Sequence, residues 1–316
     1  MFSSLPRRVS VYEVSPRDGL QNEKAVVSLE KKVDLIAALA RAGVSKIEAT
    51  SFVAKDWIPQ LADADELVPR LAPLEKEGIP GFTALVPNLR GLERAKNAGL
   101  REVAFFMSAS ETHNQKNTNK SIADSLAVFA ELAPVAKSAG MRVRAYLSTL
   151  WGCPYEGAVD PNRALDIAVK LRDTGAYRIS LGDTIGCGTP AQTNAILKLF
   201  ASQISADLLA MHMHDTRGTA LANVLVGLEN GITEFDAAVG GLGGCPYAPG
   251  AAGNLATEDL VYMLHGMGIE TGIDLEKLIS AASLAEEIVG RALPGKVHQA
   301  GLDIRKSARS SSGGQT

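Results

Sequence analysis

The 316-residue sequence contains only three cysteines, and this scarcity limits the classes of protein to which it can belong. Cys153, Cys187 and Cys245 are odd in number and lie far apart along the chain. Small secreted proteins that depend on disulfides carry even, closely spaced sets of cysteines, so we expect free thiols in a reducing compartment instead. A soluble cytoplasmic protein is therefore the expected class.

Long apolar runs and basic blocks are missing as well. No apolar stretch approaches the ~20 residues that a membrane-spanning helix needs, so a membrane protein is not expected. Met1–Arg8 lacks the apolar core of a signal peptide, although Arg7 and Arg8 are compatible with a short targeting remnant. The net charge is −3 and no lysine- and arginine-rich block occurs, so nucleic acid is not an expected partner.

A repeated joint between helix-like and strand-like segments indicates the architecture. Each helix-like segment ends at a glycine, and an apolar run follows within a few residues. Glycine suits this place because the residue after a helix often adopts a left-handed conformation. The glycines are Gly43, Gly78, Gly99, Gly140, Gly175 and Gly231. Two further runs lack the joint, which gives eight expected strands: 9–14, 46–50, 82–86, 102–106, 142–146, 178–181, 208–213 and 233–236.

The segments between these runs carry helix signals. Apolar residues recur at helical spacing between Leu29 and Ala40, after Ser28 as an N-cap. Asp160 and Thr189 each precede a proline, which is a common pair at the start of a helix. Strands that alternate with helices about every 30 residues predict an α/β fold, a (β/α)₈ TIM barrel and not an open doubly wound sheet. The absence of a Gly-x-Gly-x-x-Gly turn and of a Walker-type loop counts against nucleotide-binding folds.

The domain organisation is expected to be simple. Hydrophobic residues make up 46% of the chain, which is ample for one large core. We predict a single domain over residues 1–306, with the barrel at about 9–266 and extra helices at about 267–306, the clearest helical pattern among them being 274–291. Residues 307–316 are small and polar and are expected to form a disordered tail.

Reactive side chains collect where the expected strands end. Arg17 and Asp18 follow the first strand, Glu48 belongs to the second, and Asp183 follows the sixth. A glycine-rich stretch around Cys245 follows the eighth strand. Because active sites of these barrels lie at the carboxyl ends of the strands, this convergence predicts an active site at that rim.

His212 and His214 lie one residue apart in the seventh expected strand. Side chains in a strand alternate between its two faces, so both imidazoles project from the same face. Paired imidazoles are typical ligands of divalent metal ions. Asp215 follows at once but faces the other way, and we expect it to support the ligands instead of binding the ion. The alternative is a strand that carries two histidines without any metal.

Four motifs together resemble the 3-hydroxy-3-methylglutaryl-CoA lyases, a family of barrel enzymes. They are RDGLQ at 17–21, SLGDT at 180–184, HMHD at 212–215 and GLGGCPY at 241–247. The resemblance extends over residues 9–278, and its specific parts are the cysteine stretch and GNLATED at 253–259. The Arg-Asp and His-x-His elements alone would also suit related synthases and aldolases.

The resemblance implies a Mg²⁺ or Mn²⁺ site with four ligands: Asp18, His212, His214 and Asn254. One carboxylate, two imidazoles and an amide oxygen leave two positions of an octahedron for a substrate hydroxyl and carboxylate. Two other readings of these residues stay open. Asp18 can serve only as an ion-pair partner of Arg17, and Asn254 only as a helix cap.

The implied activity is that of a carbon–carbon lyase (EC 4.1.3.4). It cleaves 3-hydroxy-3-methylglutaryl-CoA to acetyl-CoA and acetoacetate, a step of leucine degradation and ketone-body formation. Arg17 is expected to stabilise enolate charge on the thioester oxygen, and Asp183 or His212 to accept the proton of the hydroxyl. The resemblance makes Cys245 the group that exchanges a proton with the acetyl carbon.

Cys245 differs from the other two thiols in its surroundings. Free cysteines are usually inert packing residues, and this is the expectation for Cys153 and Cys187. Glycines on both sides of Cys245 favour a loop that closes over the substrate as a lid. Cys153 lies in a similar Gly-Cys-Pro-Tyr setting and is the residue to use as a control.

Other side chains near the rim have less specific roles. Glu48 is expected to form a salt bridge with Arg17 and so to orient it. Gln21 and Ser51 are expected to contact the substrate or to support the site, and Tyr146 either joins them or packs inside the barrel. The sequence does not identify the residues that hold the CoA phosphates.

Alternative functions fall into two classes. A lyase for a longer-chain 3-hydroxyglutaryl-CoA, or a Claisen-type synthase of the same barrel group, would share most of the site. The synthases do not depend on the cysteine stretch, so Cys245 counts against them. A non-catalytic barrel that binds only metal or CoA would need none of Arg17, Asp183 and Cys245. The expected partner is a small acyl-CoA substrate, and the family resemblance alone implies a homodimer.

Overall fold

The computed structural model describes residues 5–76, 81–244 and 253–301, and in this part of the chain eight parallel strands close into a barrel. Each strand pairs with its neighbours in sequence, and β1 closes the ring by pairing with β8. The strands are β1 (Ser10–Glu13), β2 (Lys46–Ser51), β3 (Phe82–Leu85), β4 (Glu102–Ser108), β5 (Arg142–Ser148), β6 (Arg178–Asp183), β7 (Leu209–Met213) and β8 (Glu234–Ala237). The predicted TIM barrel and the predicted order of its strands are confirmed.

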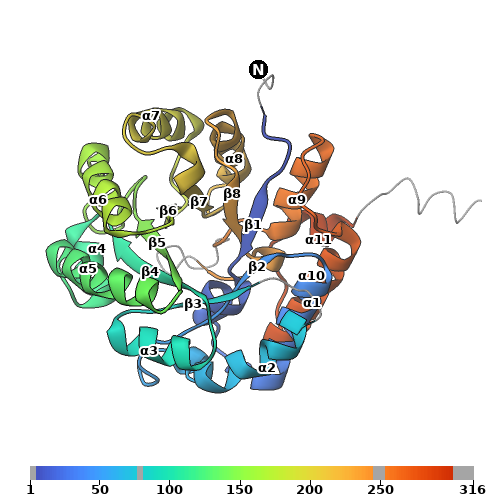
Figure 1. Ribbon diagram of the computed structural model, residues 1–316. Coiled ribbons are helices and arrows are strands. Elements are labelled where there is room, and N and C mark those ends of the chain that lie inside the picture. The colour runs from blue at the N-terminus through green and yellow to red at the C-terminus, as the bar shows by residue number, and fades with distance from the viewer. Residues whose placement is uncertain (1–4, 77–80, 245–252, 302–316) are drawn as a thin grey trace, which may run out of the picture.

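Helices form a ring outside the strands (Figure 1). They are α1 (Leu29–Arg41), α2 (Ala64–Lys76), α3 (Leu89–Asn97), α4 (Glu111–Thr118), α5 (Ile122–Ser138), α6 (Pro161–Thr174), α7 (Pro190–Phe200), α8 (Ala220–Glu229), α9 (Thr257–Gly266), α10 (Leu275–Val289) and α11 (Lys296–Ala300). The extra helix predicted at 274–291 is α10, which packs against α1. The sequence pattern did not predict α4, an additional helix between β4 and β5. The expected tail, 307–316, lies outside the described residues.

The predicted helix starts are present. The side chain of Ser28 accepts a hydrogen bond from a backbone N–H in the first turn of α1. Asp160 and Thr189 do the same for α6 and α7, each with the following proline in the first turn. These caps satisfy backbone donors that the helix itself leaves without partners.

The glycines at the helix ends adopt the conformation that the joint predicted. Gly43 has φ +94° and Gly175 has φ +120°, both outside the range that other residues adopt easily. A Cβ atom at Gly43 would lie 2.3 Å from the carbonyl oxygen of Gly272, so a side chain does not fit there. Gly78 lies outside the described residues.

A polar layer fills the barrel interior below the carboxyl ends of the strands. Arg144 of β5 is fully buried and forms ion pairs with Glu234 and Asp236 of β8. Its guanidinium lies 4.0 Å from the ring centre of Tyr12 and 4.8 Å from that of Tyr146. A buried charge is tolerated only when it is paired, so these ion pairs hold Arg144 in place. The layer they form is the charged floor of the barrel, below the carboxyl ends of the strands.

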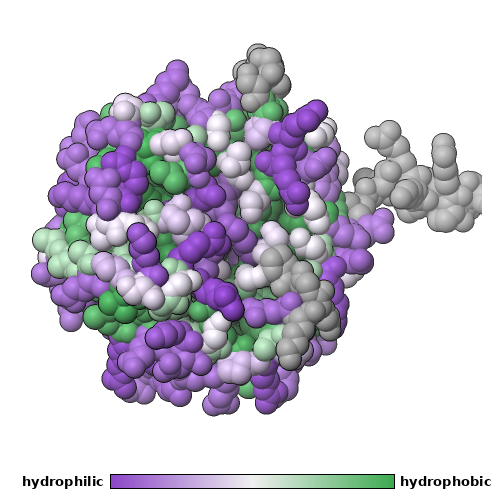
Figure 2. Space-filling model, in the orientation of Figure 1, coloured by the Kyte–Doolittle hydropathy of each residue, from purple (hydrophilic) through white to green (hydrophobic). Residues whose placement is uncertain are grey.

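Polar residues are frequent on the face of the molecule that Figure 2 shows. Hydrophilic residues dominate the rim of the face shown in Figure 2, where the outward sides of the helices meet water. Within the three described ranges, no helix is both long enough and apolar enough to cross a membrane.

Candidate active site and metal centre

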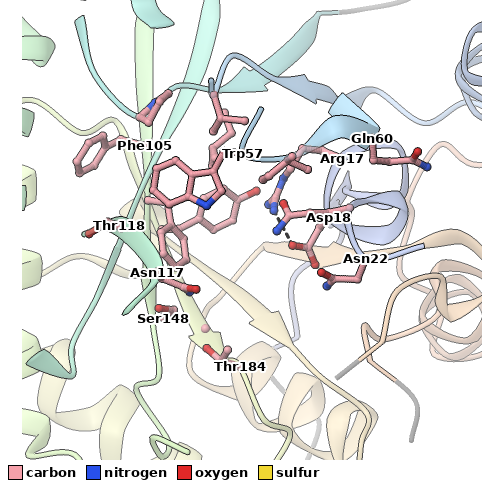
Figure 3. Close-up of a pocket in the computed structure, with 18 of the residues that line it drawn as sticks. Arg17, Asp18, Asn22, Trp57, Gln60, Phe105, Asn117, Thr118, Ser148 and Thr184 are labelled. Atoms are coloured by element: carbon pink, nitrogen blue, oxygen red, sulfur yellow. Dashed lines mark hydrogen bonds and ion pairs between the residues drawn. The ribbon is translucent and has the colours of Figure 1, made fainter. Parts of the chain in front are cut away.

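A pocket of about 780 Å³ opens at the carboxyl ends of the strands, where the sequence predicted the active site. In the close-up of Figure 3, Arg17 and Asp18 lie on one side of the pocket, and Asn117 and Thr118 lie on the other. Segments far apart in the sequence contribute residues to its wall. Among these residues are Arg17, Asp18, Gln21, Tyr146, Ser148, Ser180, Gly182, Thr184, His212, His214 and Gly244.

Three of the predicted metal ligands meet inside this pocket. Asp18 belongs to a short π-helical turn, Ser15–Gly19, that begins two residues after the end of β1. His212 lies in β7, and His214 lies one residue beyond its end. One ligand atom from each of the three lies within 4.8 Å of the others, a spacing at which a single ion can bind them all. The clustering that the sequence predicted for these three side chains is confirmed.

Asn254 reaches the same cluster from the segment after β8. It pairs with His214 in an isolated antiparallel bridge, which fixes its backbone beside β7. Its amide group donates to Asp18 Oδ2 at 2.9 Å and to the Leu242 carbonyl oxygen at 3.2 Å. The helix cap that was the alternative for Asn254 is excluded, because α9 is preceded by Ala256 at the cap position. Its part in metal binding stays a prediction.

The electrostatics of the cluster keep its members in the forms that bind cations. Burial opposes ionisation of Asp18, but the charges of Arg17 and the two histidines outweigh it and lower the pKa of Asp18 below its usual range. Burial and the neighbouring His212 lower the pKa of His214 to about 4. His214 Nδ1 is buried without a hydrogen-bond partner among the described residues. At neutral pH the site therefore presents a carboxylate and a neutral imidazole, and this donor set fits a divalent ion.

Arg17 is fixed between two carboxylates. Its Nη1 donates to Asp18 Oδ1 at 2.5 Å, and its Nε donates to Glu48 Oε2 at 2.8 Å. The hydroxyl of Tyr146 donates to the same Glu48 oxygen at 3.0 Å, and Tyr146 lines the pocket. Burial opposes the charge on Arg17, but Glu48 and Asp18 outweigh this effect and raise its pKa. The predicted Arg17–Glu48 salt bridge is confirmed, and Tyr146 belongs to the site.

Asp183 is at the predicted end of β6, but its carboxylate turns away from the pocket. The oxygens accept hydrogen bonds from the backbone N–H groups of Gly188, at 2.7 Å, and Cys187, at 3.0 Å. The inward positions of β6 are Ser180 and Gly182, which line the pocket, whereas Asp183 is not part of its wall. Burial raises the pKa of this carboxyl. Asp183 thus stabilises the turn after β6, and its part in proton transfer stays a prediction.

The remaining predicted residues divide between the wall and its surroundings. Gln21 lines the pocket, as predicted for a substrate contact, whereas Ser51 is buried at the end of β2 and is not part of the wall. Cys153 is buried, with Sγ 2.9 Å from Ser110 Oγ, and does not line the pocket. Cys245, for which a catalytic role was predicted, lies outside the described residues.

Asp215 does not support the histidines. Its carboxylate accepts hydrogen bonds from Lys296 Nζ at 2.8 Å and from the backbone N–H of Ala220 at the start of α8. The prediction of a supporting role was wrong because the carboxylate reaches charged and backbone donors on the far side of the strand. The carboxylate that does contact His212 is Asp236, which the sequence analysis did not single out.

Apolar side chains stand at the pocket mouth. Trp57 is 56% exposed and Val26 is 72% exposed, and both contribute to the wall. Figure 3 shows the Trp57 ring in the middle of the view, between Arg17 and Thr118. Lys24 and Lys120 add positive charge to the same wall. A mouth with exposed apolar and cationic groups suits a ligand with both apolar and anionic parts.

Several known proteins are similar to this chain over nearly its whole length. The HMGL-like family matches residues 8–285. Hydroxymethylglutaryl-CoA lyase YngG of Bacillus subtilis is 49% identical over 291 residues, which are 92% of this chain and 96% of the relative. The crystal structure of Bacillus subtilis HMG-CoA lyase has a TM-score of 0.91 at 48% identity, and the match covers 94% of this chain and 98% of that one. An HMG-CoA lyase from Acinetobacter baumannii, solved in complex with coenzyme A and 3-methylmalate, has a TM-score of 0.88 at 39% identity and coverage of 94% and 96%.

Proposed function

This chain belongs to the HMGL-like family, and from that premise we propose that it cleaves 3-hydroxy-3-methylglutaryl-CoA to acetyl-CoA and acetoacetate in a metal-dependent reaction. The family resemblance of the sequence motifs is thereby confirmed. One observation carries the proposal beyond family membership: the cluster of Asp18, His212 and His214 lies in the same pocket as the buried Arg17. This combination supplies a cation site and a fixed positive charge side by side.

The metal site is proposed to hold Mg²⁺ or Mn²⁺. The described ligand atoms are one carboxylate oxygen and two imidazole nitrogens, with the Asn254 amide beside them. When bound, a divalent cation would hold and acidify the tertiary hydroxyl of the substrate. Asp18, His212, His214 and Asn254 are the residues that would hold it.

Arg17 is proposed to stabilise the enolate that departs as acetyl-CoA. Cleavage of the bond between C2 and C3 leaves negative charge on the thioester oxygen, and a guanidinium held in place by Glu48 and Asp18 needs no reorganisation to meet it. Removal of a donor of this kind typically lowers turnover by about 10²–10³. The carboxylates position Arg17, and Tyr146 in turn holds Glu48.

Two proton transfers complete the reaction. The hydroxyl must lose a proton as the C2–C3 bond breaks, and the enolate carbon must gain one. Asp183 does not line the pocket, and the one free lone pair of His212 would be used by the metal ion, so we assign the first transfer to a water in the pocket. We assign the second to Cys245, as the resemblance implies.

The acyl-CoA substrate is proposed to lie with its acyl group at the metal cluster and its CoA arm at the mouth. Trp57 and Val26 offer apolar surface there, and Lys24 and Lys120 offer positive charge. The Acinetobacter baumannii relative was solved with coenzyme A, which agrees with this class of ligand.

Product analysis with a panel of 3-hydroxy-3-methylacyl-CoA thioesters tests the proposal. We expect acetoacetate and acetyl-CoA in equal amounts from the six-carbon 3-hydroxy-3-methylglutaryl group, only while Mg²⁺ or Mn²⁺ is present, and loss of activity in excess chelator. Full activity in chelator would refute the metal role. A clear preference for a longer acyl chain would move the function to the related lyases.

We also propose that the protein is located in the cytoplasm. Cys153 and Cys187 are free thiols, as expected in a reducing compartment. A homodimer is expected from the family, and sedimentation analysis of the purified protein tests it.

A further inference from the structure

We propose that Asp236 is a positioning residue that holds His212 in the tautomer and orientation needed to bind the metal ion. The inference rests on the proposed metal site and adds a residue to it. Asp236 Oδ2 lies 3.2 Å from His212 Nδ1, and the carboxylate is fully buried in the barrel. Among the residues that the structure describes, His212 has no other hydrogen bond to a side chain that would fix its ring.

The strand register brings the two residues together. His212 of β7 and Asp236 of β8 are direct partners in the parallel ladder, and both side chains point into the barrel. An acceptor at Nδ1 places the proton of the neutral imidazole on that nitrogen. Nε2 is then the nitrogen with a free lone pair, and it is the one that a cation can use. Metal-binding histidines commonly depend on such a carboxylate partner.

Asp236 is itself held rigidly. Both of its oxygens accept hydrogen bonds from Arg144, and Ser180 Oγ donates to Oδ2 at 2.8 Å. Arg144 is confined in turn between the rings of Tyr12 and Tyr146. A carboxylate that accepts these three hydrogen bonds has little freedom to rotate. The His212 ring therefore meets an acceptor in one fixed position before any ion binds.

A purely structural role is the competing explanation, because Asp236 also balances the charge of Arg144. Glu234 separates the two roles. It lies two residues earlier in the same strand, is equally buried, and forms an ion pair with Arg144 at 3.4 Å. No contact between Glu234 and His212 is present among the described residues. A change at Glu234 should disturb Arg144 without touching the histidine.

The test compares Asp236→Asn with Glu234→Gln in the full-length protein. Mn²⁺ affinity is measured by electron paramagnetic resonance, and stability by thermal unfolding of the metal-free protein. We expect Asp236→Asn to weaken Mn²⁺ binding by about 10–100-fold, and Glu234→Gln to lower stability while Mn²⁺ affinity stays within about two-fold of wild type. Equal losses of affinity in the two variants, or no loss in Asp236→Asn, would overturn the proposal.

A second measurement needs no variant and remains decisive if Asp236→Asn fails to fold. Nitrogen-15 NMR of histidine-labelled, metal-free wild-type protein reports which ring nitrogen carries the proton. We expect neutral His212 to carry it on Nδ1, and a proton on Nε2 would overturn the proposal. Neither measurement uses turnover, so absence of lyase activity in the wild-type protein would refute the proposed function and leave this inference standing.

Discussion

Replacement of Arg17 by methionine separates catalysis from structure at this site. Methionine keeps most of the side-chain volume but removes the positive charge that faces the substrate. We expect turnover of the thioester to fall by about 10²–10³, the typical effect of losing one preorganised donor to a developing oxyanion. Steady-state kinetics at saturating Mg²⁺ measures this effect.

Arg17→Met should also lower the free energy of unfolding, by an amount that follows from the contacts of Arg17. Glu48 is fully buried and its ion pair with Arg17 spans 2.8 Å. Breaking a buried ion pair from one side typically costs about 3–5 kcal/mol, because the remaining charge has no partner. Burial already raises the pKa of Glu48, so the carboxyl can take up a proton, and we expect a loss near the lower figure, about 3 kcal/mol. Denaturant unfolding measures it.

The double variant Arg17→Met/Glu48→Gln is the control. It removes both charges, so we expect it to regain most of the lost stability while turnover remains as low as in the single variant. Mn²⁺ affinity should stay within a few-fold of wild type in both, because Asp18 keeps its carboxylate. Recovery of turnover in the double variant, or loss of metal binding in the single one, would show that Arg17 acts only through the structure.

Other predictions concern the thiol, the buried histidine and the pocket mouth. Cys245→Ala should lose far more activity than Cys153→Ala in the same assay, and equal losses would contradict a special role for Cys245. The pKa of His214 is lowered from 6.5 to about 4, so between these values the unfolded chain binds a proton that the folded chain does not; the free energy of unfolding of the metal-free protein should therefore fall as pH drops through this window. A denaturation series across that range checks the sign, and stability that rises with acid would contradict it. Trp57→Ala should raise KM several-fold with little change in kcat, whereas an unchanged KM would place the CoA arm elsewhere.

The fold was predictable because its signals are local. Glycines such as Gly43 and Gly175 mark the ends of helices by a backbone requirement that no neighbour can alter. Apolar runs between them have the length of buried strands. The extra helix α4 escaped prediction because its sequence, ETHNQKNT, has no apolar face.

The site was predictable where the direction of a side chain depends on its own strand alone. Strand alternation placed His212 and His214 together, and the same rule turned Asp215 away. Applied to β6, it would also have turned Asp183 away, since Ser180 and Gly182 occupy the inward positions. At Ser51 the rule gives no answer, because the pairing of β2 with β3 shifts register just before it.

Contacts that depend on register between distant strands stayed hidden. Asp236 meets His212 only because β8 pairs with β7 in one particular register. Tyr146 reaches Glu48 across the barrel, 98 residues away in sequence. A single sequence gives the direction of a side chain within its strand but not the partner that it meets on another strand.

The charged floor of the barrel affects the order in which the two products leave the pocket. Arg144, Glu234 and Asp236 fill the interior below the pocket, so the substrate enters and both products leave through the mouth. In the proposed orientation, the half of the substrate with the hydroxyl and the carboxylate lies deepest, and the half with the thioester lies in the path outward. We therefore expect ordered release, with acetyl-CoA leaving before acetoacetate. Product inhibition kinetics would then show acetoacetate, and not acetyl-CoA, competing with the substrate for the free enzyme.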